Sequence, residues 1–267
     1  PPNTLTVMND VRVGLVQLSS NIATQTVSDR VARAEALARE AAGKSDFVVL
    51  PELWLTGAFD IENAVRLAEP IDGPLVAIFR EIAATTQTWL HMGSFPESDG
   101  ENVYNTAVLI APDGVVAATY RKIHLFGFTE GEPLFITAGS DLVVVDTPLG
   151  RTGLATCYDL RFPEQFRALV DAGADAFVLT SGWPDRRIEH WRVLLQARAI
   201  ENLAWVVAAN GIGTQHSTEL GGHSAVISPL GEVIAEGSGG EEIVFADVTP
   251  GQAQDWREKF PALNDRV

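Results

Sequence analysis

A succession of strand and helix signals occurs twice in this chain, and this repetition limits the possible folds more than any other feature. Each copy begins with a short, continuous apolar run, at residues 47–50 and at residues 177–179. A helical segment, a strand, a loop and a hairpin with Pro-x-Gly at its turn follow each run, with the turns at residues 112–114 and 229–231. Strands that are apolar along their length are typical of sheets covered on both faces.

The two copies predict an α/β fold with four layers. In each copy, one face of a sheet would pack against helices, and the two remaining faces would pack against each other as an α-β-β-α sandwich. The chain has 267 residues, of which 46% are hydrophobic, which is enough for such a core. We see no linker, so we expect a single domain over residues 1–267, with a flexible leader over 1–10 and a polar C-terminal tail over 252–267.

Hydrophobic periodicity and turn signals place the individual elements. The apolar run at residues 47–50 stops at Pro51, which suits a buried strand, and Ser28 is the expected N-cap of the first helix. We expect helices at residues 28–42, 74–86, 162–172 and 189–202, and strands at residues 12–18, 47–50, 89–95, 103–110, 115–120, 142–145, 152–157, 176–180, 205–210, 224–228, 233–236 and 243–248.

Charge and cysteine content exclude several classes of function. The formal net charge is −16, which disfavours binding to nucleic acid or to anionic membranes, because both need a basic surface. The acidity indicates a well-solvated surface or adaptation to salt. A single cysteine allows no internal disulfide, and no zinc-type spacing of Cys and His occurs, so we expect neither metal nor cofactor. Residues 1–8 do not resemble a signal peptide, and no apolar run is long enough to span a membrane, so we expect a cytoplasmic protein.

Three chemically reactive side chains come at the ends of expected strands. Cys157 ends an apolar strand just before a helix that starts near Pro163, and α/β enzymes place reactive groups at such sheet edges. Glu52 directly follows the buried strand at residues 47–50, where a carboxylate is costly unless it is paired or used. Lys122 ends the second strand of the first hairpin, in a chain with only three lysines. A compact ammonium there is not equivalent to a guanidinium.

A thiol at neutral pH needs activation before it becomes an effective nucleophile. Histidine is the usual activator, but no sequence context pairs any of the five histidines with Cys157, and we expect them to be structural. The carboxylate and the ammonium at the other two strand ends are therefore the better candidates for partners of the thiol.

Three sequence blocks carry a resemblance to a known family. They are Leu50-Pro51-Glu52, Tyr120-Arg121-Lys122-Ile123-His124 and Cys157-Tyr158-Asp159-Leu160-Arg161-Phe162-Pro163-Glu164. In this order, the blocks resemble the nitrilase superfamily of carbon–nitrogen hydrolases, from about residue 12 to residue 248. The segments 180–184 and 189–191 resemble the amidase-type branches more than true nitrilases.

The resemblance implies a role for each of these residues. Cys157 would be the nucleophile, and Glu52 would be the general base that takes the thiol proton and later activates water. Lys122 would stabilise the tetrahedral oxyanion, together with the backbone N–H of Tyr158.

The family also has a second glutamate shortly after the lysine. Glu130, in Thr129-Glu130-Gly131-Glu132, matches that place best by its Glu-Gly dipeptide, and Glu132 is the lesser candidate. We interpret Asp159 and Arg161 as a structural ion pair that holds the turn after Cys157.

The substrate is less constrained than the chemistry. Trp54, Phe128, Trp183 and His190 would either line a substrate pocket or pack in the core. A small acyl pocket lined by Trp183 favours short aliphatic carboxamides, hydrolysed to acid and ammonia through a thioester on the cysteine. The alternative is an ω-amidase acting on dicarboxylic acid monoamides, in which Arg186 or Arg187 would bind the distal carboxylate.

Other functions remain open at this point. They are hydrolysis of N-carbamoyl compounds, acceptance of nitriles, and a redox-sensing or binding module on the same fold. A binding module would not need all three reactive residues, and a redox sensor would need a second thiol. The resemblance also implies a homodimer or larger homo-oligomer assembled through the helical face.

Overall fold

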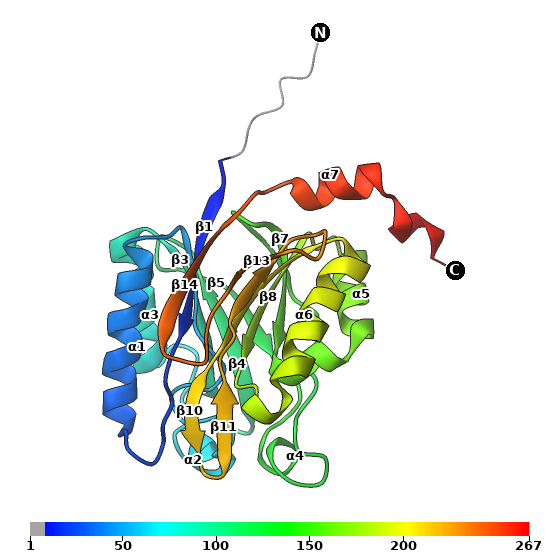
Figure 1. Cartoon of the computed structure of the whole chain (residues 1–267). Helices are drawn as coiled ribbons and strands as arrows, with labels where there is room; N and C mark the ends of the chain where they lie inside the picture. The colour runs from blue at the N-terminus through cyan, green and yellow to red at the C-terminus, as the bar shows by residue number, and fades with distance from the viewer. Residues whose placement is uncertain (1–8, 267) are drawn as a thin grey trace.

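The computed structural model describes residues 9–266 and contains two six-stranded sheets packed face to face (Figure 1). The expected leader falls almost entirely on residues outside this range. The strands of the first sheet, in spatial order, are β14 (Glu242–Val248), β1 (Val11–Gln17), β2 (Phe47–Val49), β3 (Trp89–Ser98), β4 (Val103–Ile110) and β5 (Val116–Arg121). Those of the second are β13 (Val233–Glu236), β12 (Ala225–Ile227), β9 (Trp205–Asn210), β8 (Ala176–Ser181), β7 (Gly150–Thr156) and β6 (Val144–Thr147).

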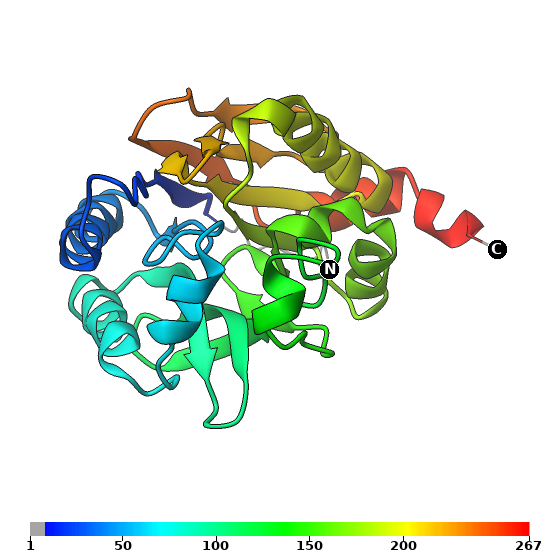
Figure 2. The same cartoon turned by 90° about the horizontal axis from the view of Figure 1, so that it is seen from below.

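Helices cover the outer face of each sheet. The helices α1 (Val27–Ala42) and α3 (Pro74–Thr86) lie on the first sheet, and α5 (Pro163–Asp171) and α6 (Ile188–Asn202) lie on the second, as Figure 2 shows end-on. A third cluster of buried side chains, including Leu15, Val49, Leu154 and Val178, fills the space between the sheets. Each such side chain contributes about 1.5–3 kcal/mol on burial. The expected α-β-β-α sandwich is confirmed.

The strand directions bring four strand ends to one edge of the molecule. In the first sheet β1, β2 and β3 are parallel, and β5 shares the direction of β3 because both are antiparallel to β4. In the second sheet β7, β8 and β9 are parallel. The residues that follow the carboxyl ends of β2, β5, β7 and β8 therefore lie in the same region between the sheets.

Most of the expected elements are present, and α3, β4, β9 and β13 have the expected bounds. The N-cap of α1 is Thr26 rather than Ser28, because the Thr26 hydroxyl accepts from the Asp29 amide while the Asp29 carboxylate accepts from the Thr26 amide. Within residues 9–266, three α-helices and two strands were not expected: α2 (Ile61–Arg66), α4 (Glu132–Phe135), α7 (Gln252–Lys259), β10 (Ile212–Gln215) and β11 (Thr218–Gly221).

The unexpected elements are short or polar, so their hydrophobic periodicity is weak. The expected polar tail contains α7, which is anchored by polar contacts: Arg257 pairs with Asp175 at 3.0 Å and donates to the carbonyls of Ala174, Asn202 and Leu203. The hairpin of β10 and β11 lies at the end of the molecule where the four strand ends meet (Figure 1).

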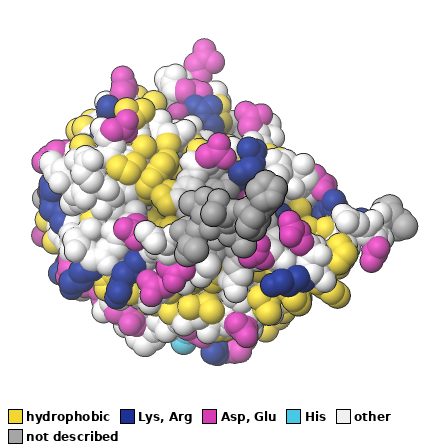
Figure 3. Space-filling view, turned by 90° about the horizontal axis from the view of Figure 1, so that it is seen from above, with side chains coloured by type: hydrophobic (Ala, Val, Ile, Leu, Met, Phe, Trp, Pro, Cys, Tyr) yellow, Lys and Arg dark blue, Asp and Glu magenta, His cyan; other side chains and the backbone are white. Residues whose placement is uncertain are grey.

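The surface carries both signs of charge. On the face shown in Figure 3, acidic and basic side chains are interspersed, without a large cluster of Lys and Arg. Within residues 9–266, no helix is long and apolar enough to cross a membrane.

Candidate active site

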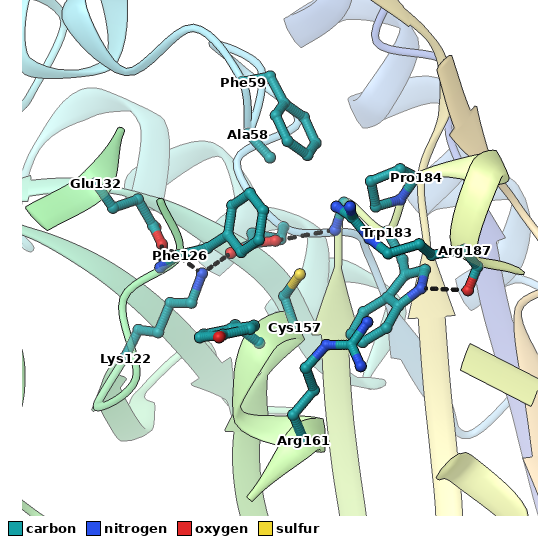
Figure 4. A pocket seen from close by; sticks show the side chains of 13 residues that line it. Ala58, Phe59, Lys122, Phe126, Glu132, Cys157, Arg161, Trp183, Pro184 and Arg187 are labelled. Carbon is teal, nitrogen blue, oxygen red and sulfur yellow. Dashed lines mark hydrogen bonds and ion pairs between the residues drawn. The ribbon is translucent and has the colours of Figure 1, made fainter. Parts of the chain in front are cut away.

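Glu52, Lys122 and Cys157 line one pocket between the two sheets. Figure 4 shows Lys122 and Cys157 in this pocket, with Glu132 beside Lys122. The pocket has a volume of about 370 Å³ including its open mouth. The three residues follow β2, β5 and β7, so their assembly results directly from the shared direction of these strands. The other lining residues are Ala58, Phe59, Phe126, Glu132, Tyr158, Arg161, Gly182, Trp183, Pro184 and Arg187.

Cys157 lies at a sharp turn from strand to helix. It is the first residue of the short 3-10 helix η1 (Cys157–Arg161), and its φ of +46° is a conformation that residues other than glycine rarely adopt. The Asp159 carboxylate fixes this turn by accepting from the Thr156 amide at 2.8 Å and from the Tyr120 hydroxyl at 2.6 Å. The backbone therefore presents the thiol at the sheet edge, with 9% of the residue exposed.

The expected ion pair between Asp159 and Arg161 is wrong. Asp159 instead accepts from the His124 amide at 3.0 Å and lies 2.8 Å from His124 Nδ1. The Arg161 guanidinium lies over the Trp183 ring, 4.8 Å from its centroid, and 3.2 Å from His190 Nδ1. Arg161 is therefore a residue of the pocket wall.

Glu52 is held by hydrogen bonds to both carboxylate oxygens. Oε1 accepts from Lys122 Nζ at 2.8 Å and from Asn105 Nδ2 at 2.9 Å, and Oε2 accepts from the Gly182 amide at 2.9 Å. The backbone beside it is supported by a bulge in β3, where Gly93 has a φ of +76° and a Cβ would lie 1.9 Å from the Pro51 carbonyl oxygen. Only glycine allows this close approach.

The second glutamate beside Lys122 is Glu132, which corrects the expectation for Glu130. Glu132 Oε2 lies 2.7 Å from Lys122 Nζ and accepts from the Phe126 amide at 2.7 Å. Glu130 is exposed and does not line the pocket; it lines an adjoining surface cavity that shares Phe126 and Glu132 with the pocket. Two glutamates that flank one glycine look equivalent in sequence, and only the path of the backbone through Gly131, with a φ of +67°, decides which one turns inward.

Asn105 is a buried residue of the cluster that sequence reasoning missed. Its side chain bonds to both Glu52 and Glu132, each at 2.9 Å. The available signal was an asparagine within an expected buried strand, in the first half of β4, because a buried amide needs hydrogen-bond partners.

Burial and charge act together on the titratable groups. Burial opposes the charged form of Lys122, but Glu132 and Glu52 outweigh it and hold its pKa well above the ordinary value. Burial raises the pKa of Glu132, with Lys122 opposing the change and Glu52 adding to it. Burial and the negative charge of Glu52 raise the pKa of the Cys157 thiol, against the effect of Lys122. The thiol is therefore protonated at neutral pH and requires a base when it reacts.

The aromatic residues that the sequence suggested for the pocket lie in three different places. Trp183 lines the pocket. Trp54 does not: it is fully buried in the core, stacks edge-on against Phe79 and donates to the Met92 carbonyl at 2.8 Å. Phe128 is 78% exposed and lies outside the pocket, in the adjoining surface cavity that Glu130 also lines.

Two arginines reach the pocket. Arg161 and Arg187 both line it, whereas Arg186 is exposed and does not. The Arg187 guanidinium lies 5.4 Å from the centroid of the Phe126 ring. Burial lowers the pKa of Arg187, and the positive charges of Arg186 and Arg161 lower it further. A ligand with a negative charge would relieve this crowding.

No group of three or more His, Cys, Asp and Glu side chains within residues 9–266 is arranged to hold a metal ion. The site instead offers a thiol, carboxylates that can exchange protons, and an ammonium. This set can perform nucleophilic substitution at a carbonyl carbon.

The α-β-β-α sandwich and this cluster define a protein of the nitrilase superfamily. A family model described as carbon-nitrogen hydrolase matches residues 12–258, and the chain belongs to this family.

Individual relatives cover nearly the whole chain. A 2-oxoglutaramate amidase of Paenarthrobacter nicotinovorans is 40% identical over 91% of this chain and 85% of its own. Omega-amidase NIT2 of Homo sapiens is 32% identical over 97% and 96%. The crystal structure of XC1258 from Xanthomonas campestris, described as a CN-hydrolase superfamily protein with an arsenic adduct in the active site, superposes with a TM-score of 0.88, 33% identity and coverage of 97% and 98%.

Proposed function

We propose that this protein is an ω-amidase, which hydrolyses the amide of a dicarboxylic acid monoamide and releases ammonia. The observation that carries this proposal is that Arg161 and Arg187 line the same pocket as Cys157. The thiol and the charged cluster would act on the amide end of the substrate, while a guanidinium binds the carboxylate at its other end.

The arginines favour this substrate class over neutral aliphatic amides. Within residues 9–266, neither Arg161 nor Arg187 forms an ion pair with a carboxylate. Aromatic rings hold both guanidiniums in place, and a preorganised guanidinium binds a carboxylate through two parallel hydrogen bonds. A neutral amide would leave both charges without a counter-ion.

The relatives support the same choice. Two of them are named 2-oxoglutaramate amidase and omega-amidase, and the first name describes a compound with an amide at one end and a carboxylate at the other. We therefore place 2-oxoglutaramate first among candidate substrates. The sequence favoured an aliphatic amidase because Trp183 would make the acyl pocket small. That argument did not consider Arg161 as a residue of the pocket, so the aliphatic amidase becomes the second choice.

The proposed reaction proceeds in two halves. Glu52 accepts the thiol proton as Cys157 Sγ attacks the amide carbon, and the negative charge on the carbonyl oxygen is stabilised by Lys122 and the Tyr158 amide. The C–N bond breaks, Glu52 returns its proton to the departing nitrogen, and ammonia leaves a thioester on Cys157. Glu52 then takes a proton from water, which attacks the thioester. The carboxylic acid leaves and the thiol regains its proton.

Ammonia release from pairs of amides of similar size tests the proposal. Succinamate and butyramide differ mainly in the distal carboxylate, and 2-oxoglutaramate, an N-carbamoyl amino acid and a nitrile complete the panel. A charge-assisted hydrogen bond contributes about 1.5–3 kcal/mol, so kcat/KM for succinamate should exceed that for butyramide by about 10- to 100-fold. Equal or better use of butyramide would contradict the proposal.

Two adjacent arginines provide a matched pair of variants. Arg187→Met should raise KM for succinamate at least tenfold and leave butyramide hydrolysis unchanged, because only the carboxylate contact is lost. Arg186→Met removes an exposed guanidinium one residue away and should leave both substrates nearly unaffected. If Arg187→Met slows both substrates equally, Arg187 supports the pocket and does not bind the carboxylate.

A further inference from the structure

Asn105 contacts all three charged residues of the cluster. It lies on β4 and is fully buried, and its Nδ2 donates to Glu52 Oε1 and to Glu132 Oε1, each at 2.9 Å. Its main-chain carbonyl accepts from the Lys122 amide at 2.9 Å. Asn105 does not line the pocket, so it lies behind the carboxylates as seen from the substrate side.

The Asn105 amide offsets an unfavourable interaction between the two buried carboxylates of the cluster. Two carboxylates lie in a buried site with one ammonium between them, and like charges in such an environment repel strongly. Lys122 Nζ bonds one oxygen of each, Glu52 Oε1 and Glu132 Oε2. An amide NH₂ group has two donors and no charge, and both of its donors are used here.

The orientation of the amide is also determined by its neighbours. Both groups facing Nδ2 are carboxylate oxygens, which only accept hydrogen bonds when ionised. Asn105 Oδ1 has no partner within residues 9–266. A flipped amide would turn this oxygen towards the two carboxylates. The network therefore requires a donor at this position, and an aspartate of the same shape would add a third negative charge.

We infer that Asn105 is a positioning residue, which holds Glu52 and Glu132 at a fixed separation around Lys122. With Oε1 of Glu52 occupied by Asn105 and Lys122, the Oε2 side of the carboxylate remains for proton transfer, anchored by the Gly182 amide. Asn105 acts through Glu52 and does not touch the substrate. The catalytic part of this inference rests on the proposed function, in which Glu52 is the base.

The kinetic test uses two substitutions at Asn105 and one control. Asn105→Leu removes both donors but keeps the branched shape of the side chain, and it should lower kcat by about 10- to 100-fold, with KM within threefold of wild type, because substrate contacts are intact. Asn105→Asp should lower kcat further at neutral pH. Asn202→Leu is the control: Asn202 is also fully buried but bonds to the Arg198 carbonyl, away from the pocket. It should lower thermal stability and leave kcat unchanged.

The outcomes separate positioning from other roles. A normal kcat in folded Asn105→Leu would overturn the inference, and so would a raised KM with unchanged kcat, which indicates substrate binding. The assay uses whichever amide the wild-type enzyme hydrolyses best, so a preference for neutral amides defeats the proposed substrate class without affecting this test.

A structural arm of the test needs no substrate. Crystal structures of wild type and Asn105→Leu should differ by about 1 Å or more in the Glu52 or Glu132 carboxylate, a displacement large enough to impair a catalytic site. Unchanged carboxylates would overturn the inference even if the protein hydrolysed no amide. If Asn105→Leu does not fold, Asn105→Ser, which keeps one donor, serves in both arms.

Discussion

The Tyr120 hydroxyl donates a 2.6 Å hydrogen bond to Asp159 Oδ2, and this bond joins the strand that precedes Lys122 to the turn that carries Cys157. The hydroxyl also accepts from Gln165 Nε2 at 2.9 Å and from the Ile123 amide at 3.2 Å. Burial raises the pKa of Tyr120 well above its ordinary value, and the Asp159 charge raises it further, so the phenol remains a donor. The relative placement of ammonium and thiol therefore depends on a buried network outside the pocket.

Tyr120→Phe should weaken both stability and catalysis. The substitution leaves Gln165 Nε2 and the Ile123 amide without their acceptor, and an unsatisfied buried group costs about 1–3 kcal/mol of unfolding free energy. Because the change also loosens the turn at Asp159, kcat should fall more than KM rises. Urea denaturation and ammonia release measure the two effects. Tyr104→Phe, which removes a hydroxyl from the first half of β4, is the control, and equal losses in both variants would contradict this role.

Substitution of the two neighbouring glutamates should have unequal effects. Glu132→Gln removes a charge that bonds to Lys122 at 2.7 Å, so hydrolysis should fall at least 100-fold. Glu130→Gln changes an exposed side chain and should retain nearly full activity. Steady-state ammonia release measures both variants. A large loss in Glu130→Gln with normal activity in Glu132→Gln would reverse the assignment.

The layers of the fold and the three strand ends could be predicted because their signals are local. Apolar runs and turn residues mark the strands, and parallel strands bring the residues at their carboxyl ends to one edge of a sheet. Glu52, Lys122 and Cys157 follow β2, β5 and β7, which run in directions that bring their carboxyl ends together, and the structure places the three residues in one pocket. Their separation along the chain does not matter once the strand directions are known.

The remaining features depend on tertiary contacts or on single backbone angles. The choice between Glu130 and Glu132 depends on the turn at Gly131. Glu52 and Trp54 both come after β2, but the Trp54 side chain points into the helix layer and packs against Phe79. Asp159 has its partner on a strand of the other sheet, which no local pattern around Arg161 indicates.

Substitution of Glu52 should speed alkylation of the Cys157 thiol but abolish amide hydrolysis. The negative charge of Glu52 is one cause of the raised thiol pKa, so Glu52→Gln should lower that pKa and increase alkylation by iodoacetamide at pH 8. One pKa unit corresponds to about tenfold more thiolate. Amide hydrolysis should be lost in the same variant, because the base is gone. Cys157→Ala should show neither reaction, since the chain has no other cysteine. Slower alkylation in Glu52→Gln would contradict the electrostatic explanation.

His91 should make the protein less stable as the pH falls. Its side chain is fully buried on β3, its Nδ1 accepts from the Gly93 amide at 3.3 Å, and its Nε2 has no partner within residues 9–266. Burial lowers its pKa to about 4, from 6.5. Below pH 6.5 the His91 imidazole is protonated in the unfolded chain but stays neutral in the folded protein. The unfolding free energy therefore falls between about pH 6.5 and pH 4, by up to about 3 kcal/mol.

The contribution of His91 is measured as a difference between variants. Glu132, whose pKa burial raises, contributes in the opposite direction, because a raised carboxyl pKa favours the folded state as the pH falls. Unfolding free energies of wild type and His91→Leu are measured by urea denaturation at pH 7, 5.5 and 4.5. Both proteins contain Glu132, so its contribution cancels in the difference between them. The variant should lose less stability on acidification, whereas His216→Leu, at an exposed position, should follow the wild type. Parallel curves for wild type and His91→Leu would show that the buried imidazole is not the cause.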